Sequence, residues 1–364
     1  MTDPTPDTSH PHTPPRAQTP SGELTPSGEL TPSGELTPSG ELTPSGELTP
    51  SGELTPSGEL TPSGELTPSG ELTPSGALKS SGGLKSSGEL TLSRELTPSG
   101  GLRSSRALTR PDAILLDFGG VLVETRTRPG WTAVLAKEVH ALLARGGCTA
   151  LDVADVEADI KAGAAGDKSW KNAMSRPFAP VEMTHVQFWR DYVAADWPAA
   201  ARQLVVAHAT PLCKRMGEVR QERTIRPGIP ELLDAAAELG IPCAVVSNAL
   251  SGAVHRDFTA ATGLAGKLAV EVYSDEVGVR KPNPEMIWIA TRALDVPPAR
   301  AWYVGDNFDR DVLCGHRAGI GGNVLMVAKG TYDVPFEIRH RPDAVVDDGH
   351  GLLALLTDAP EGDR

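Results

Sequence analysis

The sequence is poor in cysteine, in aromatic residues and in long apolar runs. Its few cysteines are widely scattered and form neither a CxxC pair nor a dense disulfide framework, so we expect reduced thiols, most of them buried. They are Cys148, Cys213, Cys243 and Cys314. No apolar run approaches the roughly 18 residues of a membrane span, and the first residues, MTDPTPDTSH, lack the basic and apolar regions of a secretory signal. We therefore expect a cytoplasmic protein with no membrane partner.

Clustered positive charge is also missing. The chain contains 47 Asp and Glu residues against 34 Lys and Arg residues, which gives a formal net charge of -13. Proteins hold nucleic-acid phosphates with clustered Lys and Arg, and no basic stripe is present here. The composition therefore argues against a nucleic-acid partner and is typical of an ordinary, mildly acidic protein.

The N-terminal part is a hexapeptide repeat. Residues 19–72 are nine copies of TPSGEL, and degenerate copies continue to Leu108. A short period can indicate a β-solenoid. However, each copy has a single apolar residue and most contain Pro and Gly, so stacked turns would bury only a thin line of Leu at a large cost in ordering entropy. We predict that residues 1–108 form a disordered, low-complexity tail.

From Asp112 the chain alternates patterns of buried strands and helices. The segment AILLDFGGVLVET begins with a continuous apolar run, and similar runs occur at residues 241–247, 268–274, 301–305 and 323–328, with a short AVV run near the C-terminus. Helix-like stretches such as PELLDAAAELG and NPEMIWIATRALD separate several of these runs. This alternation predicts a Rossmann-like, three-layer α/β/α domain with a parallel sheet covered on both faces.

One long insertion interrupts the alternation. Residues 127–226 have the pattern of helices only, for example WTAVLAKEVHALLARGG and THVQFWRDYVAADWP. We therefore predict an all-helical cap at 127–226 and a core formed by residues 111–126 and 227–356. Because the insertion follows the first strand directly, the cap could fold over the carboxyl ends of the strands as a lid.

Polar and charged residues that could act in one reaction follow the predicted strands. In an open parallel sheet, ligands bind beyond the carboxyl ends of the strands, so these residues are candidates for one shared site. They are Asp117, Gly119 and Gly120 after the first run, Ser247 and Asn248 after the second, Lys281 before Pro282, and Asp306 and Asp311 after the run at residues 301–305.

This set resembles the four motifs of the haloacid dehalogenase-like hydrolase superfamily. Those motifs are an Asp at a strand end, a Ser or Thr after a strand, a Lys, and a final acidic pair. All four occur in order here, within AILLDFGGVLVET, IPCAVVSNA, VGVRKPNPEMI and YVGDNFDRDVLCGHRAG. The resemblance extends over roughly two thirds of the chain and fits the subfamily that carries a helical cap after the first motif.

The resemblance implies a Mg²⁺-dependent phosphatase for a small phosphorylated metabolite. Asp117 would attack phosphorus to form an aspartyl phosphate, which water then hydrolyses. Lys281 and Mg²⁺ would neutralise the negative charges that meet in this step. The implied phosphate-binding groups are Ser247, the backbone amide of Asn248 and Lys281, and the implied metal ligands are Asp117, the carbonyl of Gly119, Asp306 and Asp311, with Asp309 close by.

One position departs from the family pattern. Phosphatases of this superfamily usually carry a second Asp two residues after the nucleophile, as general acid and then base, and Gly119 stands there in this chain. Proton transfer of this kind typically contributes about 10² to 10⁴ in rate. His140, Glu138 or Glu182 of the cap could supply the acid instead, and the sequence does not select among them.

Three functions therefore stay open. The first is a phosphatase for a substrate with a good leaving group, such as a sugar 1-phosphate or an acyl phosphate. The second is cleavage of a carbon–halogen or carbon–phosphorus bond, the latter through a cap lysine such as Lys137, Lys168 or Lys171. The third is a non-catalytic module that binds phosphoryl groups. Oligomeric state is not indicated.

Overall fold

The computed structural model describes residues 108–361. The predicted tail at residues 1–108 therefore lies outside the described residues, apart from Leu108. Six parallel strands form one sheet in the order β5-β4-β1-β6-β7-β8. The strands are β1 (Ala113–Leu116), β4 (Cys243–Ser247), β5 (Val270–Tyr273), β6 (Ala301–Gly305), β7 (Gly322–Met326) and β8 (Ala344–Val346).

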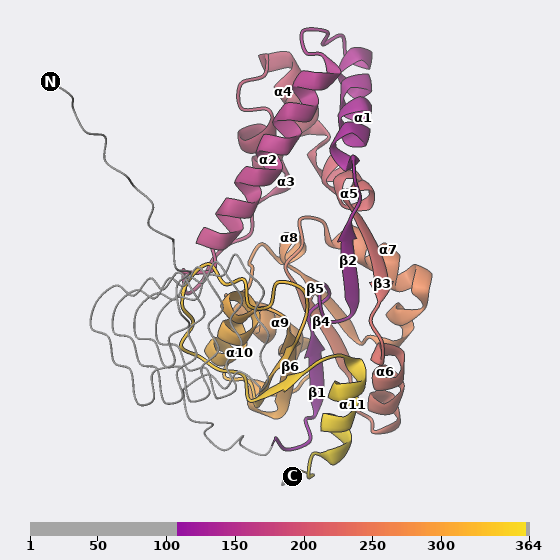
Figure 1. Ribbon diagram of the computed structural model, residues 1–364, viewed down its shortest axis with the longest axis vertical. Helices are drawn as coiled ribbons and strands as arrows, with labels where there is room; N and C mark the ends of the chain where they lie inside the picture. The colour runs from indigo at the N-terminus through magenta and orange to yellow at the C-terminus, as the bar shows by residue number, and fades with distance from the viewer. Residues whose placement is uncertain (1–107, 362–364) are drawn as a thin grey trace, which may run out of the picture. The chain divides into compact units, whose positions relative to one another are not determined.

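Helices cover both faces of the sheet (Figure 1). Side chains alternate between the faces of a strand, and in β1 Ile114 and Leu116 join one apolar cluster while Leu115 joins another. The first cluster includes side chains from α6 (Ile229–Glu238) and α11 (Gly349–Asp358), and the second from α9 (Glu285–Ala293) and α10 (Leu313–Ala318). The predicted three-layer α/β/α fold is confirmed.

The remaining core elements connect these strands. They are α7 (Gly252–Thr262), α8 (Ser274–Val277), the 3₁₀ turns η2 (Leu264–Lys267) and η3 (Pro298–Arg300), and the π-helical turn η4 (Phe308–Val312). The turn η4 comes directly after β6 and contains Asp311, so it brings a second acidic residue back to the end of the strand.

A helical cap lies between the strands β2 (Val123–Thr127) and β3 (Gln221–Ile225). Its elements are α1 (Trp131–Arg145), α2 (Val153–Ala173), α3 (His185–Gln187), the π-helical turn η1 (Phe188–Val193), α4 (Ala199–Ala207) and α5 (Ala209–Arg220). These helices share an apolar cluster of their own, which contains Val139, Ile160 and Trp189. The longest helix, α2, begins at a capping box in which Asp152 and Asp155 accept hydrogen bonds from each other's backbone amides at 2.8 and 3.3 Å.

The expectation of an all-helical insertion at residues 127–226 is wrong at its C-terminal end. Gln221–Ile225 forms strand β3, which pairs antiparallel with β2. The segment QERTI has alternating burial, with its first, third and fifth side chains turned inward. Such alternation is typical of a strand, but Ile225 is the one apolar residue of the segment, so the signal is hidden. The result is a two-stranded ribbon between core and cap (Figure 1).

The cap also contacts the core away from this ribbon. The buried carboxylate of Glu182 forms an ion pair with Arg280 at 2.9 Å. Ser175 donates a hydrogen bond to Asp309 at 2.7 Å. The segment between α2 and α3 is therefore attached to the core at two points, Arg280 next to Lys281 and Asp309 in η4. Among residues 108–361, no helix combines the length and the apolar character that crossing a membrane requires.

Candidate active site

The site lies at the carboxyl ends of three neighbouring strands. β1 pairs with β4 on one side and with β6 on the other, so Asp117, Ser247 and Asp306, which end or follow these strands, meet at one edge of the sheet. The backbone amide of Asp117 still donates to the carbonyl of Val304 at 2.9 Å. The carboxylate of Asp117 is therefore held on a rigid strand end, where it also accepts a hydrogen bond from the amide of Phe118 at 2.7 Å.

Lys281 joins two acidic residues of the site. Its Nζ lies 2.9 Å from Oδ1 of Asp117 and 2.6 Å from Oδ1 of Asp311. The same Nζ donates to the hydroxyl of Tyr303 at 2.8 Å, and that hydroxyl donates to Asp311 at 2.6 Å. The Lys281 side chain is only 1% exposed. A buried ammonium of this kind is fixed by its partners and keeps its charge next to Asp117.

Asn248 holds Lys281 in place. Its side-chain amide donates to the backbone carbonyl of Lys281 at 3.1 Å, and its side-chain oxygen accepts from the backbone amide of Lys281 at 2.8 Å. Ser247 lines the same cavity as Asp117, and its hydroxyl helps to lower the pKa of that carboxyl group against the effect of burial. The structure therefore brings Ser247, Asn248 and Lys281 together around Asp117.

Three buried carboxylates lie close enough to share a cation. One oxygen from each of Asp117, Asp306 and Asp311 lies within 4.8 Å of the others. The second oxygen of Asp311 accepts from the backbone amides of Asp306 and Asn307 at 3.1 and 2.9 Å, which fixes the turn after β6. Three buried carboxylates facing one ammonium leave an excess of negative charge, and hard divalent cations prefer such oxygen ligands. The residues present therefore fit a divalent metal ion.

Burial and mutual repulsion shift the pKa values of the three carboxyl groups. Burial raises the pKa of Asp306 well above its ordinary value, and repulsion by Asp311 and Asp117 adds to this effect. Burial also raises the pKa of Asp117, against the opposing effect of Lys281. Burial alone would raise the pKa of Asp311 too, but Lys281 and Tyr303 hold it below its usual value. Without a further cation, simultaneous ionisation of all three carboxyl groups is unfavourable.

Two successive glycines at the nucleophile have different surroundings. Gly120 has a φ of +79°, and a Cβ atom on it would lie 2.2 Å from Oδ2 of Asp306. Only glycine fits this position without displacing Asp306. At Gly119, apart from its chain neighbours, no described heavy atom lies within 4 Å of the place that a Cβ would take. The space in which the family pattern expects a second Asp is open.

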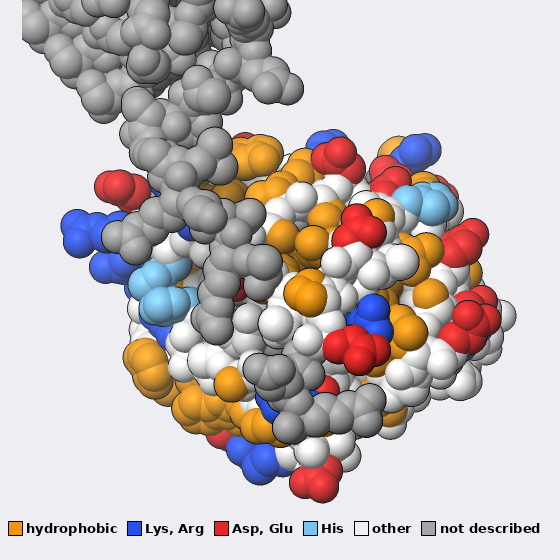
Figure 2. Space-filling view, turned by 90° about the horizontal axis from the view of Figure 1, so that it is seen from below, with side chains coloured by type: hydrophobic (Ala, Val, Ile, Leu, Met, Phe, Trp, Pro, Cys, Tyr) orange, Lys and Arg blue, Asp and Glu red, His pale blue; other side chains and the backbone are white. Residues whose placement is uncertain are grey.

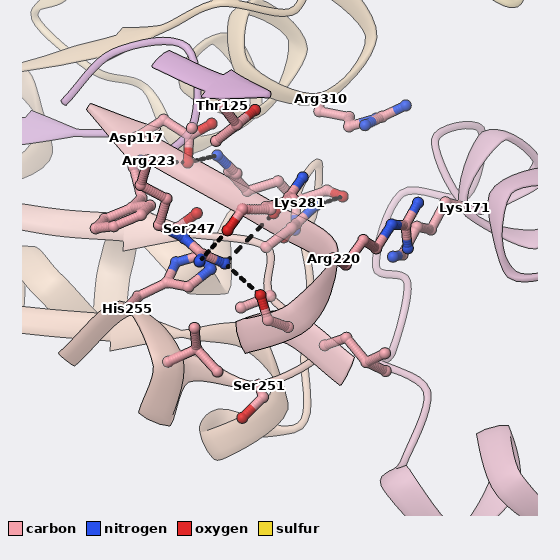
Figure 3. Close-up of a pocket in the computed structure, with 18 of the residues that line it drawn as sticks. Asp117, Thr125, Lys171, Arg220, Arg223, Ser247, Ser251, His255, Lys281 and Arg310 are labelled. Carbon is pink, nitrogen blue, oxygen red and sulfur yellow. Dashed lines mark hydrogen bonds and ion pairs between the residues drawn. The ribbon is translucent and has the colours of Figure 1, made fainter. Parts of the chain in front are cut away.

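A cavity of about 280 Å³ lies over these residues, between core and cap. Several basic side chains line it in addition to Lys281: Lys171, Arg220, Arg223 and Arg310. Lys171 and Arg220 come from the cap helices α2 and α5, Arg223 from strand β3 and Arg310 from η4. In Figure 3 Lys171, Arg220 and Arg310 lie on the same side of Asp117, across the cavity from the strand ends. The sequence analysis named Lys171 only as a possible lysine for carbon–phosphorus cleavage and did not identify the three arginines, because their approach depends on how the cap contacts the core.

The cap residues that the sequence offered as a general acid do not line this cavity. Glu138 forms an exposed ion pair with Arg215 at 2.8 Å. Glu182 is occupied by Arg280, and its other oxygen accepts a hydrogen bond from Ser274 at 2.5 Å. His140 is also absent from the lining. Of the three cap lysines considered for carbon–phosphorus cleavage, the lining contains Lys171 and neither Lys137 nor Lys168.

Comparisons with known proteins match this chain to one protein family. A family model described as haloacid dehalogenase-like hydrolase matches residues 111–319. Glyceraldehyde 3-phosphate phosphatase of Methanopyrus kandleri is 41% identical over 86 residues, which are 21% of this chain and 36% of that protein. The plasmid-borne phosphoglycolate phosphatase of Cupriavidus necator is 35% identical over 136 residues, which are 37% of this chain and 57% of that protein. The chain thus spans about a third to two thirds of the length of such curated relatives.

Among solved structures, CbbY from Rhodobacter sphaeroides in complex with phosphate is similar to this chain. It has a TM-score of 0.41 and 21% sequence identity, and the match covers 68% of this chain and 99% of CbbY.

Proposed function

Because the chain belongs to the family of haloacid dehalogenase-like hydrolases, we propose that this hydrolase is a Mg²⁺-dependent phosphatase of small phosphorylated molecules, with Asp117 as its covalent nucleophile. The observation that carries the proposal is the contact of Asp117 with a buried lysine beside two further carboxylates. Two relatives with phosphatase names share 35% and 41% identity with parts of the chain and support it.

The first step transfers the phosphoryl group to the protein. Oδ of Asp117 attacks phosphorus, the bond from phosphorus to the leaving oxygen breaks, and the electron pair stays with that oxygen. A carboxylate and a phosphoryl group are both anionic, so their approach requires fixed positive charge. In our proposal Lys281 provides it, and the Ser247 hydroxyl and the backbone amide of Asn248 would bind phosphoryl oxygens.

The second step releases phosphate. A water molecule attacks phosphorus, the bond to Asp117 breaks with its electron pair, and the proton of the water passes to the phosphate product. Splitting one displacement into two steps in this way is the advantage of covalent catalysis. Mg²⁺, held by Asp117, Asp306, Asp311 and the carbonyl of Gly119, would neutralise phosphoryl charge and orient the group for attack.

Turnover of an aryl phosphate by the full chain tests the proposal. We expect hydrolysis of 4-nitrophenyl phosphate that depends on Mg²⁺ and is lost in Asp117→Asn and in Asp306→Asn. Incubation with 2-chloropropionate tests the dehalogenase alternative in parallel. Release of chloride without any phosphatase activity would contradict the proposal, and so would phosphate release that survives Asp117→Asn.

A further inference from the structure

In the described part of the chain, no carboxyl group outside the nucleophile and the proposed metal ligands lines the cavity. Among the described residues that line it, the carboxyl groups are those of Asp117, Asp306 and Asp311. All three belong to the nucleophile and the metal cluster. A leaving alkoxide, in contrast, needs a proton as it departs, because it is strongly basic.

Two other lining groups could in principle donate a proton. His255 stacks on Phe118 with ring centroids 4.1 Å apart, and burial lowers its pKa to about 3, so at neutral pH it is an uncharged imidazole. The ammonium of Lys171 is held by the buried carboxylate of Asp167 at 2.7 Å. Neither group has the properties of an efficient acid for a leaving alkoxide.

The cap side of the cavity instead presents positive charge. Arg220 and Arg223 have no carboxylate oxygen within 4.0 Å among residues 108–361. The Nε atom of each is buried and has no hydrogen-bond partner in that part of the chain. Arg223 donates only to backbone and amide oxygens, at 3.2 to 3.4 Å. Both arginines are partly buried. Guanidinium groups that are partly withdrawn from water without a counter-ion are costly, and their persistence in a cavity points to an anionic ligand.

The face of the core away from the cap carries charges of both signs, with acidic and basic side chains interspersed (Figure 2). Arg220 and Arg223 line the same cavity as the buried carboxylates, and in Figure 3 Arg220 lies across from Asp117 while Arg223 lies on the Asp117 side, near His255. A substrate placed with its phosphoryl group at Asp117 would therefore direct its leaving group toward Arg220 and Arg223.

We propose that the substrate is a phosphoric anhydride whose leaving group is itself a phosphate anion, received by Arg220 and Arg223. This inference rests on the proposed phosphatase function and specifies its substrate class. When Asp117 attacks the terminal phosphorus, the bridging P–O bond breaks and its electron pair remains on the leaving phosphate. A phosphate oxygen is weakly basic and needs no proton at that moment. The guanidinium groups stabilise the charge that develops, so they take the place of a general acid.

The open space at Gly119 gives a direct test with the full chain. Inorganic pyrophosphate and glycerol 3-phosphate serve as substrates with a weakly basic and a strongly basic leaving group. We expect the wild type to hydrolyse pyrophosphate with a kcat/KM at least about 10² higher than that for glycerol 3-phosphate. In Gly119→Asp, glycerol 3-phosphate turnover should rise by about 10² to 10⁴ while pyrophosphate turnover rises less than about tenfold.

The role of Arg220 and Arg223 is tested by comparing the KM values of their variants for pyrophosphate and for 4-nitrophenyl phosphate. Arg220→Gln and Arg223→Gln should each raise KM for pyrophosphate by at least about tenfold and leave KM for 4-nitrophenyl phosphate within about threefold. Because both substrates are measured on the same preparation, a folding defect would affect both. Arg220→Lys and Arg223→Lys retain the charge and should recover part of the loss.

The outcomes separate the inference from the function that it rests on. Equal wild-type rates on glycerol 3-phosphate and pyrophosphate would overturn the inference alone, as would arginine variants that affect both substrates equally. Loss of turnover in Lys171→Arg, which keeps the charge but is no acid, would identify Lys171 as the proton donor and also overturn it. No turnover of any of the three substrates, by wild type or Gly119→Asp, would refute the phosphatase function and the inference together.

Discussion

The ammonium of Lys281 lies 2.9 Å from the carboxylate of Asp117, and neither side chain is more than 10% exposed. The two charges compensate each other in a place from which water is excluded. Two carboxylates, those of Asp117 and Asp311, raise the pKa of Lys281 above its ordinary value, although burial alone would lower it. The lysine is therefore a permanent cation at the nucleophile.

Removal of this cation should reduce turnover strongly. Lys281→Met takes away the charge that offsets the meeting of carboxylate and phosphoryl group, and we expect kcat to fall by about 10² to 10³. The measurement is steady-state hydrolysis of 4-nitrophenyl phosphate with Mg²⁺ in excess. Lys161→Met is the matched control, because Lys161 is a surface lysine paired with Glu157 and 60% exposed. A Lys281→Met enzyme as active as this control would contradict the role given to Lys281.

A methyl group on Gly120 should displace Asp306. The added Cβ would lie 2.2 Å from Oδ2 of Asp306, and the positive φ adds strain of about 1 to 2 kcal/mol. We expect Gly120→Ala to weaken Mg²⁺ binding by at least about tenfold in calorimetric titration. Gly130→Ala is the control: it has a similar φ of +70° but no described heavy atom near its Cβ position. Equal Mg²⁺ affinity in both variants would show that Asp306 is not a ligand.

The buried pair of Glu182 and Arg280 should matter more when it is broken than when it is replaced. Glu182→Ala leaves the guanidinium of Arg280, 1% exposed, without its carboxylate. We expect the free energy of unfolding to fall by about 3 to 5 kcal/mol in urea denaturation. The double variant Glu182→Leu with Arg280→Met removes both charges and should lose less. A double variant that is less stable than the single one would argue against this account.

Stability should depend on pH through His185. This cap histidine lies 3.4 Å from Asp275 and binds the carbonyl of Leu250 at 2.7 Å, and the hydrogen bond to Asp275 is the main cause that raises its pKa. Because the folded-state pKa lies above the unfolded value of about 6.5, the stabilisation is full below that pH and is lost as the pH rises through the folded-state pKa.

His185→Gln separates this effect from the other titrations of the protein. We expect the difference in unfolding free energy between wild type and His185→Gln to be larger at pH 6 than at pH 8. The measurement is urea denaturation of both proteins at the two pH values. A difference that stays constant, or that grows toward pH 8, would exclude a charged His185 in the folded state.

The core of the fold was predictable because its strands are short apolar runs with polar residues at their ends. The AVV run near the C-terminus is strand β8, and the runs at residues 241–247 and 301–305 contain β4 and β6. In a parallel sheet the carboxyl ends share one edge, so the spacing of Asp117, Ser247 and Asp306 already placed them together. Their catalytic and metal-binding roles remain predictions.

The ribbon and the cap side of the site were not predictable in the same way. β3 is made of QERTI, in which the inward positions are Gln221, Arg223 and Ile225. Because only Ile225 is apolar, the segment has no hydrophobic period to detect. Arg220 is one of many charged residues on predicted cap helices, and nothing in its spacing marks it. Its place in the cavity depends on the packing of a 15-residue helix, α1, whose Trp131 stacks under the Arg220 guanidinium at 5.3 Å.

Mass spectrometry of the phosphorylated enzyme tests the central claim most directly. The full chain is mixed with excess 4-nitrophenyl phosphate and Mg²⁺, quenched in acid during turnover, digested and mapped. We expect a phosphoryl group on Asp117, in the peptide that contains AILLDFGG, and none in the Asp117→Asn enzyme. Steady phosphate release with no phosphoryl group on Asp117 at any quench time, or with the group on another residue, would contradict the account.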